Sequence, residues 1–127
     1  MPPLILVVDD EPNIVLSIEY LMRRSGYETR IAHNGKAALQ ALRERAPDLV
    51  LLDVTMPDHD GYAVCQQMRT NPLWRAIPII MLTARGRDVE REKGLALGAN
   101  DYITKPFSTK ALIERVKAHL GTAKRGG

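Results

Sequence analysis

Residues 4–10 read Leu-Ile-Leu-Val-Val-Asp-Asp, a run of five apolar side chains that ends in two carboxylates. A short, continuous apolar run is typical of a strand that is buried on both faces of a parallel sheet. Ligands bind such sheets just beyond the carboxyl ends of the strands. Asp9 and Asp10 are therefore predicted to lie at a binding edge.

Two later apolar runs end in the same manner. Residues 49–53 read Leu-Val-Leu-Leu-Asp, and residues 77–83 read Ile-Pro-Ile-Ile-Met-Leu-Thr. Because the carboxyl ends of parallel strands meet at one edge of the sheet, we expect Asp53 and Thr83 to join the first two carboxylates. Lys105, which follows a shorter and more polar strand, is a further candidate for this site.

Length and composition indicate one domain with an ordinary aqueous surface. The chain has 127 residues, of which 45% are hydrophobic and 26% are charged, as in globular proteins with a single core.

No segment has the apolar length of a membrane span and no signal-like pattern begins the chain, so a cytoplasmic location without a membrane partner is expected. Cys65 is the single cysteine, which excludes an internal disulfide. The net charge of +3 is spread along the chain without a nucleic-acid motif, so direct nucleic-acid binding is not expected.

Strand-like and helix-like segments alternate five times along the chain. Right-handed crossovers turn such units into a doubly wound parallel sheet with helices on both faces. Apolar strands belong in the centre and polar strands at the edges, which predicts the flavodoxin-like α/β fold with strand order 2-1-3-4-5. The domain is expected over residues 1–120, with 121–127 as a flexible tail or linker stub. The predicted strands are 4–9, 28–32, 48–53, 77–83 and 101–104, and the predicted helices are 12–25, 34–45, 62–70, 88–97 and 108–120.

The three clustered carboxylates favour a metal site that serves phosphoryl chemistry. Carboxylates brought together repel one another unless a cation intervenes, and Mg²⁺ prefers a few carboxylate ligands together with water and phosphate oxygens. Phosphoryl transfer needs neutralisation of charge on several oxygens, which Mg²⁺, a lysine and a threonine hydroxyl can supply. Asp53, at the end of the central strand, is the best candidate for a nucleophile that forms an aspartyl phosphate.

Four motifs, each at a strand end and in this order, resemble the receiver domain of two-component response regulators. The resemblance extends from about Leu4 to Leu120, and it is closest to the receivers of winged-helix transcription regulators. The motifs are Asp9-Asp10, Asp53 with Met56-Pro57-Asp58-His59-Asp60-Gly61, Thr83-Ala84, and Lys105-Pro106-Phe107.

The resemblance implies a role for each acidic residue. Asp53 would accept a phosphoryl group from the phosphohistidine of a sensor histidine kinase or a phosphotransfer protein. Asp10 and Asp53 would bind Mg²⁺ through their side chains, Thr55 through its backbone carbonyl, and Asp9 through a water molecule. The protein would catalyse its own phosphorylation and dephosphorylation and act as a signalling switch, without converting an external metabolite.

The resemblance also implies how the phosphoryl group is held and sensed. Thr83 and Lys105 would contact phosphoryl oxygens, and a cis peptide bond would precede Pro106. Movement of Thr83 would let Tyr102 turn inward, which would change the surface of the fourth helix, fifth strand and fifth helix for an output domain or protein.

Three positions near the site are expected to tune the lifetime of the phosphoryl group: Thr55, Ala84 and Arg85. Arg85 adds a long cation beside the small Ala84, and we expect it to slow hydrolysis by shielding the phosphoryl group or by pairing with it. The rate of phosphate loss in Arg85→Ala tests this expectation, and an unchanged rate would dismiss it.

Two other classes of protein place carboxylates at a similar edge. A haloacid-dehalogenase-like phosphatase also uses a strand-end aspartate and Mg²⁺, but it requires a second aspartate where this chain has Thr55. A flavodoxin-like cofactor binder needs a phosphate loop rich in Ser, Thr and Gly, whereas Asp9-Asp10-Glu11 would repel phosphate. Both alternatives are disfavoured.

The identity of the output is not fixed by the sequence. Asp101 and Arg115 match the charged face through which receivers of winged-helix regulators form phosphorylation-dependent homodimers. Ala96, Asn100 and Ala111 replace acidic residues that are usual there. The chain is either a stand-alone receiver or a receiver excised from a longer protein.

Overall fold

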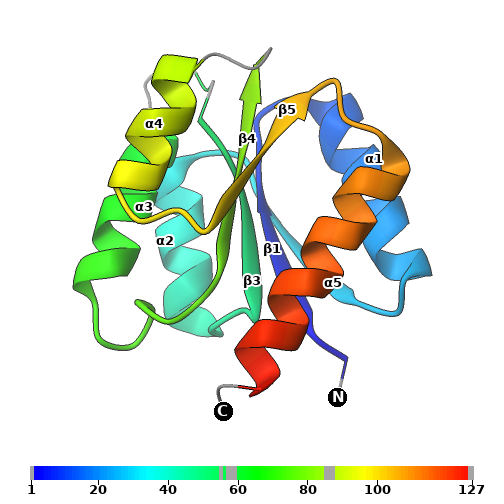
Figure 1. Ribbon diagram of the computed structural model, residues 1–127. Helices are drawn as coiled ribbons and strands as arrows, with labels where there is room; N and C mark the ends of the chain where they lie inside the picture. The colour runs from blue at the N-terminus through cyan, green and yellow to red at the C-terminus, as the bar shows by residue number, and fades with distance from the viewer. Residues whose placement is uncertain (1, 55, 57–59, 85–87, 126–127) are drawn as a thin grey trace.

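Five parallel strands form one sheet in the order β2-β1-β3-β4-β5, which confirms the predicted fold (Figure 1). A computed structural model describes residues 2–54, 56, 60–84 and 88–125, without the side chains at positions 60, 84, 88–91 and 122–125. Its elements are β1 (Leu4–Val8), α1 (Pro12–Arg24), β2 (Glu28–Ala32), α2 (Gly35–Glu44), β3 (Leu49–Asp53), α3 (Asp60–Thr70), β4 (Ile79–Ala84), α4 (Asp88–Ala96), β5 (Asp101–Lys105) and α5 (Thr109–Arg125).

The sheet is covered by helices on both faces, and the strand sequences alternate between two cores. Helices α1 and α5 cover one face, while α2, α3 and α4 cover the other (Figure 1). On β1, Ile5 and Val7 belong to the core beneath α1 and α5, whereas Leu6 and Val8 belong to the opposite core. Successive side chains of a strand point to opposite faces, so a strand buried on both sides must be apolar throughout. Among the described residues, no helix combines the length and the apolar character needed to cross a membrane.

Local sequence signals account for both ends of α1 and for the start of α2. Asn34 caps α2, because its side-chain oxygen accepts a hydrogen bond from the backbone N–H of Ala37 at 2.8 Å. Pro12 occupies the start of α1, where its missing N–H would have had no helical partner. Gly26 follows α1 with φ of 92°, a conformation that side chains with a Cβ rarely adopt.

Three boundaries differ by two or more residues from the sequence-based expectation. Helix α3 begins at Asp60, two residues earlier than predicted. Strand β4 begins at Ile79 rather than Ile77, because the N–H of Ile77 bonds to the carbonyl of Trp74 at 3.0 Å and Pro78 has no N–H to donate. Helix α5 continues through Gly121 to Arg125, past its predicted end at residue 120.

Helix α4 approaches the sheet closely at a glycine. Leu95, one residue later in this helix, is 42% exposed. A Cβ added at Gly94 would collide with the sulfur of Met81, a buried residue of β4. The missing side chain at position 94 therefore allows the helix to approach the strand closely.

Arg69, near the end of α3, bonds both to the segment that precedes β4 and to the segment that follows α4. Its Nε donates to the carbonyl of Gly98 at 2.7 Å, and its Nη1 donates to the carbonyls of Arg75 and Ile77. Its Nη2 donates to the side-chain oxygen of Asn100 at 2.7 Å. Burial lowers the pKa of this guanidinium. The arginine fixes the end of the sheet that lies opposite to the carboxyl ends of the strands.

Candidate functional site

Asp9 and Asp53 lie side by side at the carboxyl ends of the two central strands. The pairing of β1 with β3 sets Val8 opposite Leu52, so the following aspartates reach the same level of the sheet. Both aspartates are fully buried, and Asp10 is exposed. One carboxylate oxygen from each of Asp9, Asp10 and Asp53 lies within 4.8 Å of the others. The structure thus brings together the three predicted carboxylates.

Lys105 reaches the same cluster from the end of β5. Its Nζ lies 2.9 Å from Oδ2 of Asp9 and 3.5 Å from Oδ2 of Asp53. The lysine side chain is only 11% exposed, so these ion pairs are poorly screened by solvent. The peptide bond between Lys105 and Pro106 is cis, as expected.

The electrostatics of the cluster favour a bound cation. Burial raises the pKa of Asp9 and repulsion from Asp53 adds to the rise, although the backbone N–H of Glu11 and the lysine oppose it. Burial alone would lower the pKa of Lys105, but its contacts with Asp9, Asp53 and Glu11 outweigh that effect and raise it. The protein therefore holds more negative charge in this space than one ammonium group satisfies.

Thr83 and Tyr102 lie on the two neighbouring strands beyond the acidic cluster. Thr83 is 1% exposed, and its Oγ1 makes no hydrogen bond to any described residue. The pairing of β4 with β5 sets Thr83 opposite Thr104, and Met81 opposite Tyr102. Tyr102 is half-buried and packs against the core on the α4 side of the sheet. The hydroxyl and the ring are thus diagonal neighbours on adjacent strands.

Several of the predicted tuning positions cannot be placed. Thr55 and Arg85 lie outside the described residues, as does the side chain of Ala84, whose backbone ends β4.

Gly61 lies in the first turn of α3, close to the strand that carries Asp53. A Cβ at Gly61 would collide with the backbone carbonyl of Asp53. This glycine lets α3 begin directly against the strand that carries the candidate nucleophile.

Glu11 also belongs to the site, although it was not among the residues predicted for it. Its Oε1 lies 3.2 Å from Nζ of Lys105. Its backbone N–H donates to Oδ1 of Asp9 at 2.9 Å, which orients that carboxylate. A possible signal was the choice of glutamate at a helix N-cap, where Ser, Thr, Asp and Asn are preferred.

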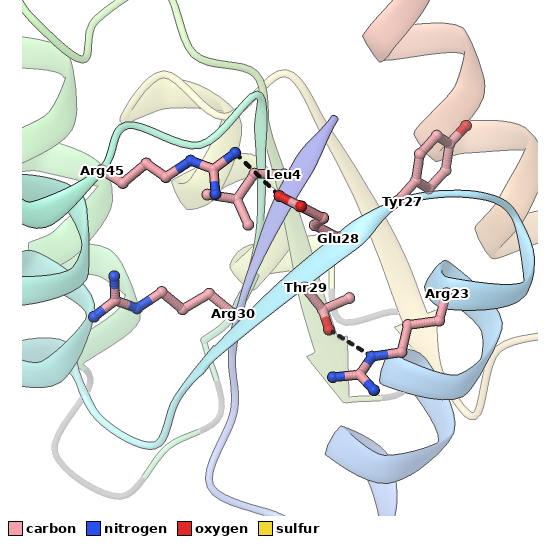
Figure 2. Close-up of a pocket in the computed structure, with 7 residues that line it drawn as sticks. All are labelled: Leu4, Arg23, Tyr27, Glu28, Thr29, Arg30 and Arg45. Carbon is pink, nitrogen blue, oxygen red and sulfur yellow. Dashed lines mark hydrogen bonds and ion pairs between the residues drawn. The ribbon is translucent and has the colours of Figure 1, made fainter. Parts of the chain in front are cut away.

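A groove lies at the opposite end of the sheet, where β1 and β2 begin (Figure 2). It has a volume of about 460 Å³ and is lined by residues of β1 and β2, by Arg23 near the end of α1 and by Arg45 after α2. Its three arginines each pair with a glutamate: Arg23 with Glu19, Arg30 with Glu44, and Arg45 with Glu28. Because these charges are balanced within the protein, the groove is a weaker candidate for chemistry than the acidic cluster.

Comparison with known proteins agrees with the geometry of the acidic cluster. Residues 5–117 match the family of the response regulator receiver domain. The chain is also similar to the signal receiver domain of a signal transduction histidine kinase from Syntrophus aciditrophicus. That comparison gives 36% identity and a TM-score of 0.89, over 97% of this chain and 93% of that one.

Two further solved structures extend the comparison. The receiver domain of a sensor histidine kinase from Pseudomonas aeruginosa PAO1, with a magnesium ion in its active-site cleft, shares 32% identity and a TM-score of 0.87. The alignment covers 95% of this chain and 99% of that chain. NtrX from Brucella abortus shares 33% identity and a TM-score of 0.91 over 99% of this chain, which corresponds to 28% of that protein.

Proposed function

This chain is a response regulator receiver domain, and from that premise we propose that Asp53 is its phosphoryl acceptor. The observation that supports this assignment best is the burial of Asp53 between a second carboxylate, Asp9, and the ammonium group of Lys105. An oxygen of Asp53 would form a bond to phosphorus while the bond from phosphorus to the histidine nitrogen of the donor breaks. The electron pair of that bond would leave with the imidazole.

Receiver domains bind Mg²⁺ at an acidic pocket, and the carboxylates of this chain fit that ion. We assign Asp10 and Asp53 as direct ligands and Asp9 as a ligand through water. The proximity of three carboxylate oxygens and the raised pKa of Asp9 support this assignment. The expected ligand at Thr55 lies outside the described residues. When bound, Mg²⁺ would neutralise charge that develops on a phosphoryl oxygen.

Lys105 and Thr83 are the groups that would hold the remaining phosphoryl oxygens. Lys105 would exchange its contact with Asp53 for one with the new phosphoryl group, and it starts 3.5 Å from the acceptor. Thr83 has a buried hydroxyl available for a new hydrogen bond. Both groups would stabilise the phosphoryl oxygens more strongly in this site than in water, because solvent is largely excluded from their surroundings.

We propose that Tyr102 transmits the event to the surface formed by α4, β5 and α5. Its support is the position of the half-buried ring beside Met81 and on the strand next to Thr83. A shift of Thr83 toward the phosphoryl group would open space on the same side of the sheet. Thr55, Ala84 and Arg85 remain the proposed tuning positions.

Receiver domains act with histidine kinases and output domains. For this chain we propose a sensor histidine kinase or a phosphotransfer protein as the phosphoryl donor. A homodimer through α4, β5 and α5 would need Asp101 and Arg115 to exchange partners. Within the chain, Nη1 of Arg115 lies 2.6 Å from Oδ1 of Asp101, and His119 lies 3.0 Å from Oδ2. The phosphatase and cofactor-binding alternatives are not supported by the comparisons.

The test is intact-mass analysis after incubation with Mg²⁺ and acetyl phosphate. We expect the wild-type protein to gain one phosphoryl group, and Asp53→Asn to gain none. Omission of Mg²⁺ should abolish the gain in the wild type. A phosphoryl group that persists on Asp53→Asn would move the acceptor to another residue, and no gain on the wild type would refute the proposal.

A further inference from the structure

The side chain of Glu11 is not used by the helix that it precedes. Glu11 occupies the N-cap of α1 with φ of −91° and ψ of 111°, and its side chain makes no capping hydrogen bond. Instead, its Oε1 lies 3.2 Å from Nζ of Lys105, a residue 94 positions later in the chain. The position of this carboxylate is therefore explained by the lysine and not by the helix.

The three carboxylates around Lys105 differ in their surroundings. Asp9 and Asp53 are buried, whereas the side chain of Glu11 is 58% exposed. The lysine thus lies between an inner pair of carboxylates, Asp9 and Asp53, and one outer carboxylate, Glu11, at the solvent-exposed rim of the acidic cluster. Its ammonium group can move between these partners through small rotations of a flexible stem.

A divalent cation in the acidic cluster would compete with the ammonium group for the same carboxylates. Oδ2 of Asp9 and Oδ2 of Asp53 lie 2.9 and 3.5 Å from Nζ of Lys105. Two cations beside these carboxylates would repel each other strongly, because little solvent screens them. Entry of the metal would therefore favour withdrawal of the lysine from the inner carboxylates.

We propose that Glu11 is a positioning residue that retains Lys105 at the rim when a divalent cation occupies the acidic cluster. In this role Glu11 favours metal binding, because the withdrawn ammonium group keeps a charged partner. This inference rests on the proposed function of the acidic cluster as the Mg²⁺ site.

A double-mutant cycle tests whether Glu11 acts through the lysine. The dissociation constant for Mg²⁺ is measured by calorimetry for the wild type, Glu11→Gln, Lys105→Met and the double variant. We expect Glu11→Gln to weaken Mg²⁺ binding by about two- to fivefold, the range of partly exposed ion pairs. In the Lys105→Met background the same substitution should have a clearly smaller effect.

Two control variants separate contact from simple charge. Glu11→Asp keeps the charge but shortens the side chain, so a contact role predicts weakening close to that of Glu11→Gln. Glu114→Gln removes an equal charge from an exposed pair with Lys110 on α5, at 4.0 Å, and should leave the dissociation constant unchanged.

The outcomes distinguish this inference from the proposed function. If the wild type binds no Mg²⁺, the proposed metal site itself fails. If Mg²⁺ binds but Glu11→Gln weakens it equally with and without Lys105, Glu11 acts only through its charge and the positioning role is refuted. Wild-type affinity in Glu11→Asp would refute it as well.

Discussion

At the scale of single residues, the site is built from charges that the fold tolerates only in combination. Asp9 is fully buried, and burial together with Asp53 raises its pKa. The ionised carboxylate is therefore less favourable in the folded protein than in the unfolded chain. Above both pKa values this difference reduces stability, so a group needed for metal binding destabilises the metal-free domain.

Replacement of this carboxylate should stabilise the metal-free protein. We expect Asp9→Asn to raise the free energy of unfolding of the metal-free protein at pH 7, because the amide replaces a buried carboxylate whose ionised form is less favourable in the folded state. The amide can still accept the hydrogen bond from the N–H of Glu11. Urea unfolding in a chelator measures the effect, with the exposed Asp10→Asn as a control that should change little. A loss of stability in Asp9→Asn would contradict this account.

Asp101 shows the opposite behaviour. Burial alone would raise its pKa, but hydrogen bonds from His119, the N–H of Tyr102 and Arg115 outweigh burial and lower it. A depressed carboxyl pKa contributes stability above the pKa of the unfolded chain, and this contribution is lost as the pH falls through the folded value. The surroundings of Asp101 thus favour folding at neutral pH.

Asp101→Asn should therefore destabilise the protein at neutral pH and not in acid. We expect a loss of about 1 kcal/mol at pH 7, the size of a typical hydrogen bond, that shrinks as the pH falls below the ordinary aspartate pKa of about 3.9. Urea unfolding of both proteins across this range measures the difference. Glu114→Gln, which alters an exposed pair, should stay within about 0.5 kcal/mol of the wild type. A difference that is constant with pH would show that the carboxylate charge is not responsible.

At the scale of elements, two glycines inside helices have opposite surroundings, one crowded and one open. Gly94 in α4 lies where a Cβ would meet the sulfur of Met81, whereas Gly121 in α5 has open space around it. Glycine within a helix is unfavourable compared with alanine, by about 0.5 to 1 kcal/mol. Only at Gly94 does close packing explain why that disadvantage is accepted.

Alanine at these two positions should change stability in opposite directions. Gly121→Ala should increase the free energy of unfolding by about 0.5 to 1 kcal/mol through helix propensity. Gly94→Ala should decrease it by about 1 to 3 kcal/mol, because Met81 is buried and must be displaced. Denaturant unfolding of the two variants in parallel checks both signs. An equal gain in both would show that α4 does not depend on this contact.

The elements also show what the sequence could and could not predict. The central strands were predictable because burial on both faces demands an unbroken apolar run, as in residues 49–52. Asp9, Asp53 and Lys105 were predictable as one cluster because parallel strands end at one edge. The close approach of α4 at Gly94 was not predictable, because a hydrophobic pattern does not reveal where a missing side chain brings a helix against a strand. The partners of Arg69 and Glu11 depend on segments far apart in the chain, and no local pattern encodes them.

At the scale of the whole molecule, metal binding should be coupled to folding. The carboxylates that would bind Mg²⁺ come from β3 and from the segment after β1, so the unfolded chain has no comparable site. A ligand that binds only the folded state stabilises it according to its free concentration.

Saturating Mg²⁺ should therefore stabilise the whole domain. At a free concentration one hundred times the dissociation constant, we expect a gain of about 2.7 kcal/mol in the free energy of unfolding. Urea unfolding with and without Mg²⁺, at matched ionic strength, measures the gain. Asp10→Asn should lose most of it, and an equal gain in that variant would place the stabilising ion elsewhere.

The order of the strands also determines when this site can first exist during biosynthesis. The carboxylates of Asp9 and Asp53 leave the ribosome early, whereas Lys105 ends the last strand, and β5 joins the sheet through β4. A nascent chain that has not yet reached residue 105 would have to bury two acids without the ammonium group that pairs with them. Completion of the sheet and completion of the phosphoryl site therefore coincide, so we expect a partly synthesised chain to remain inert toward phosphodonors until its final strand has emerged.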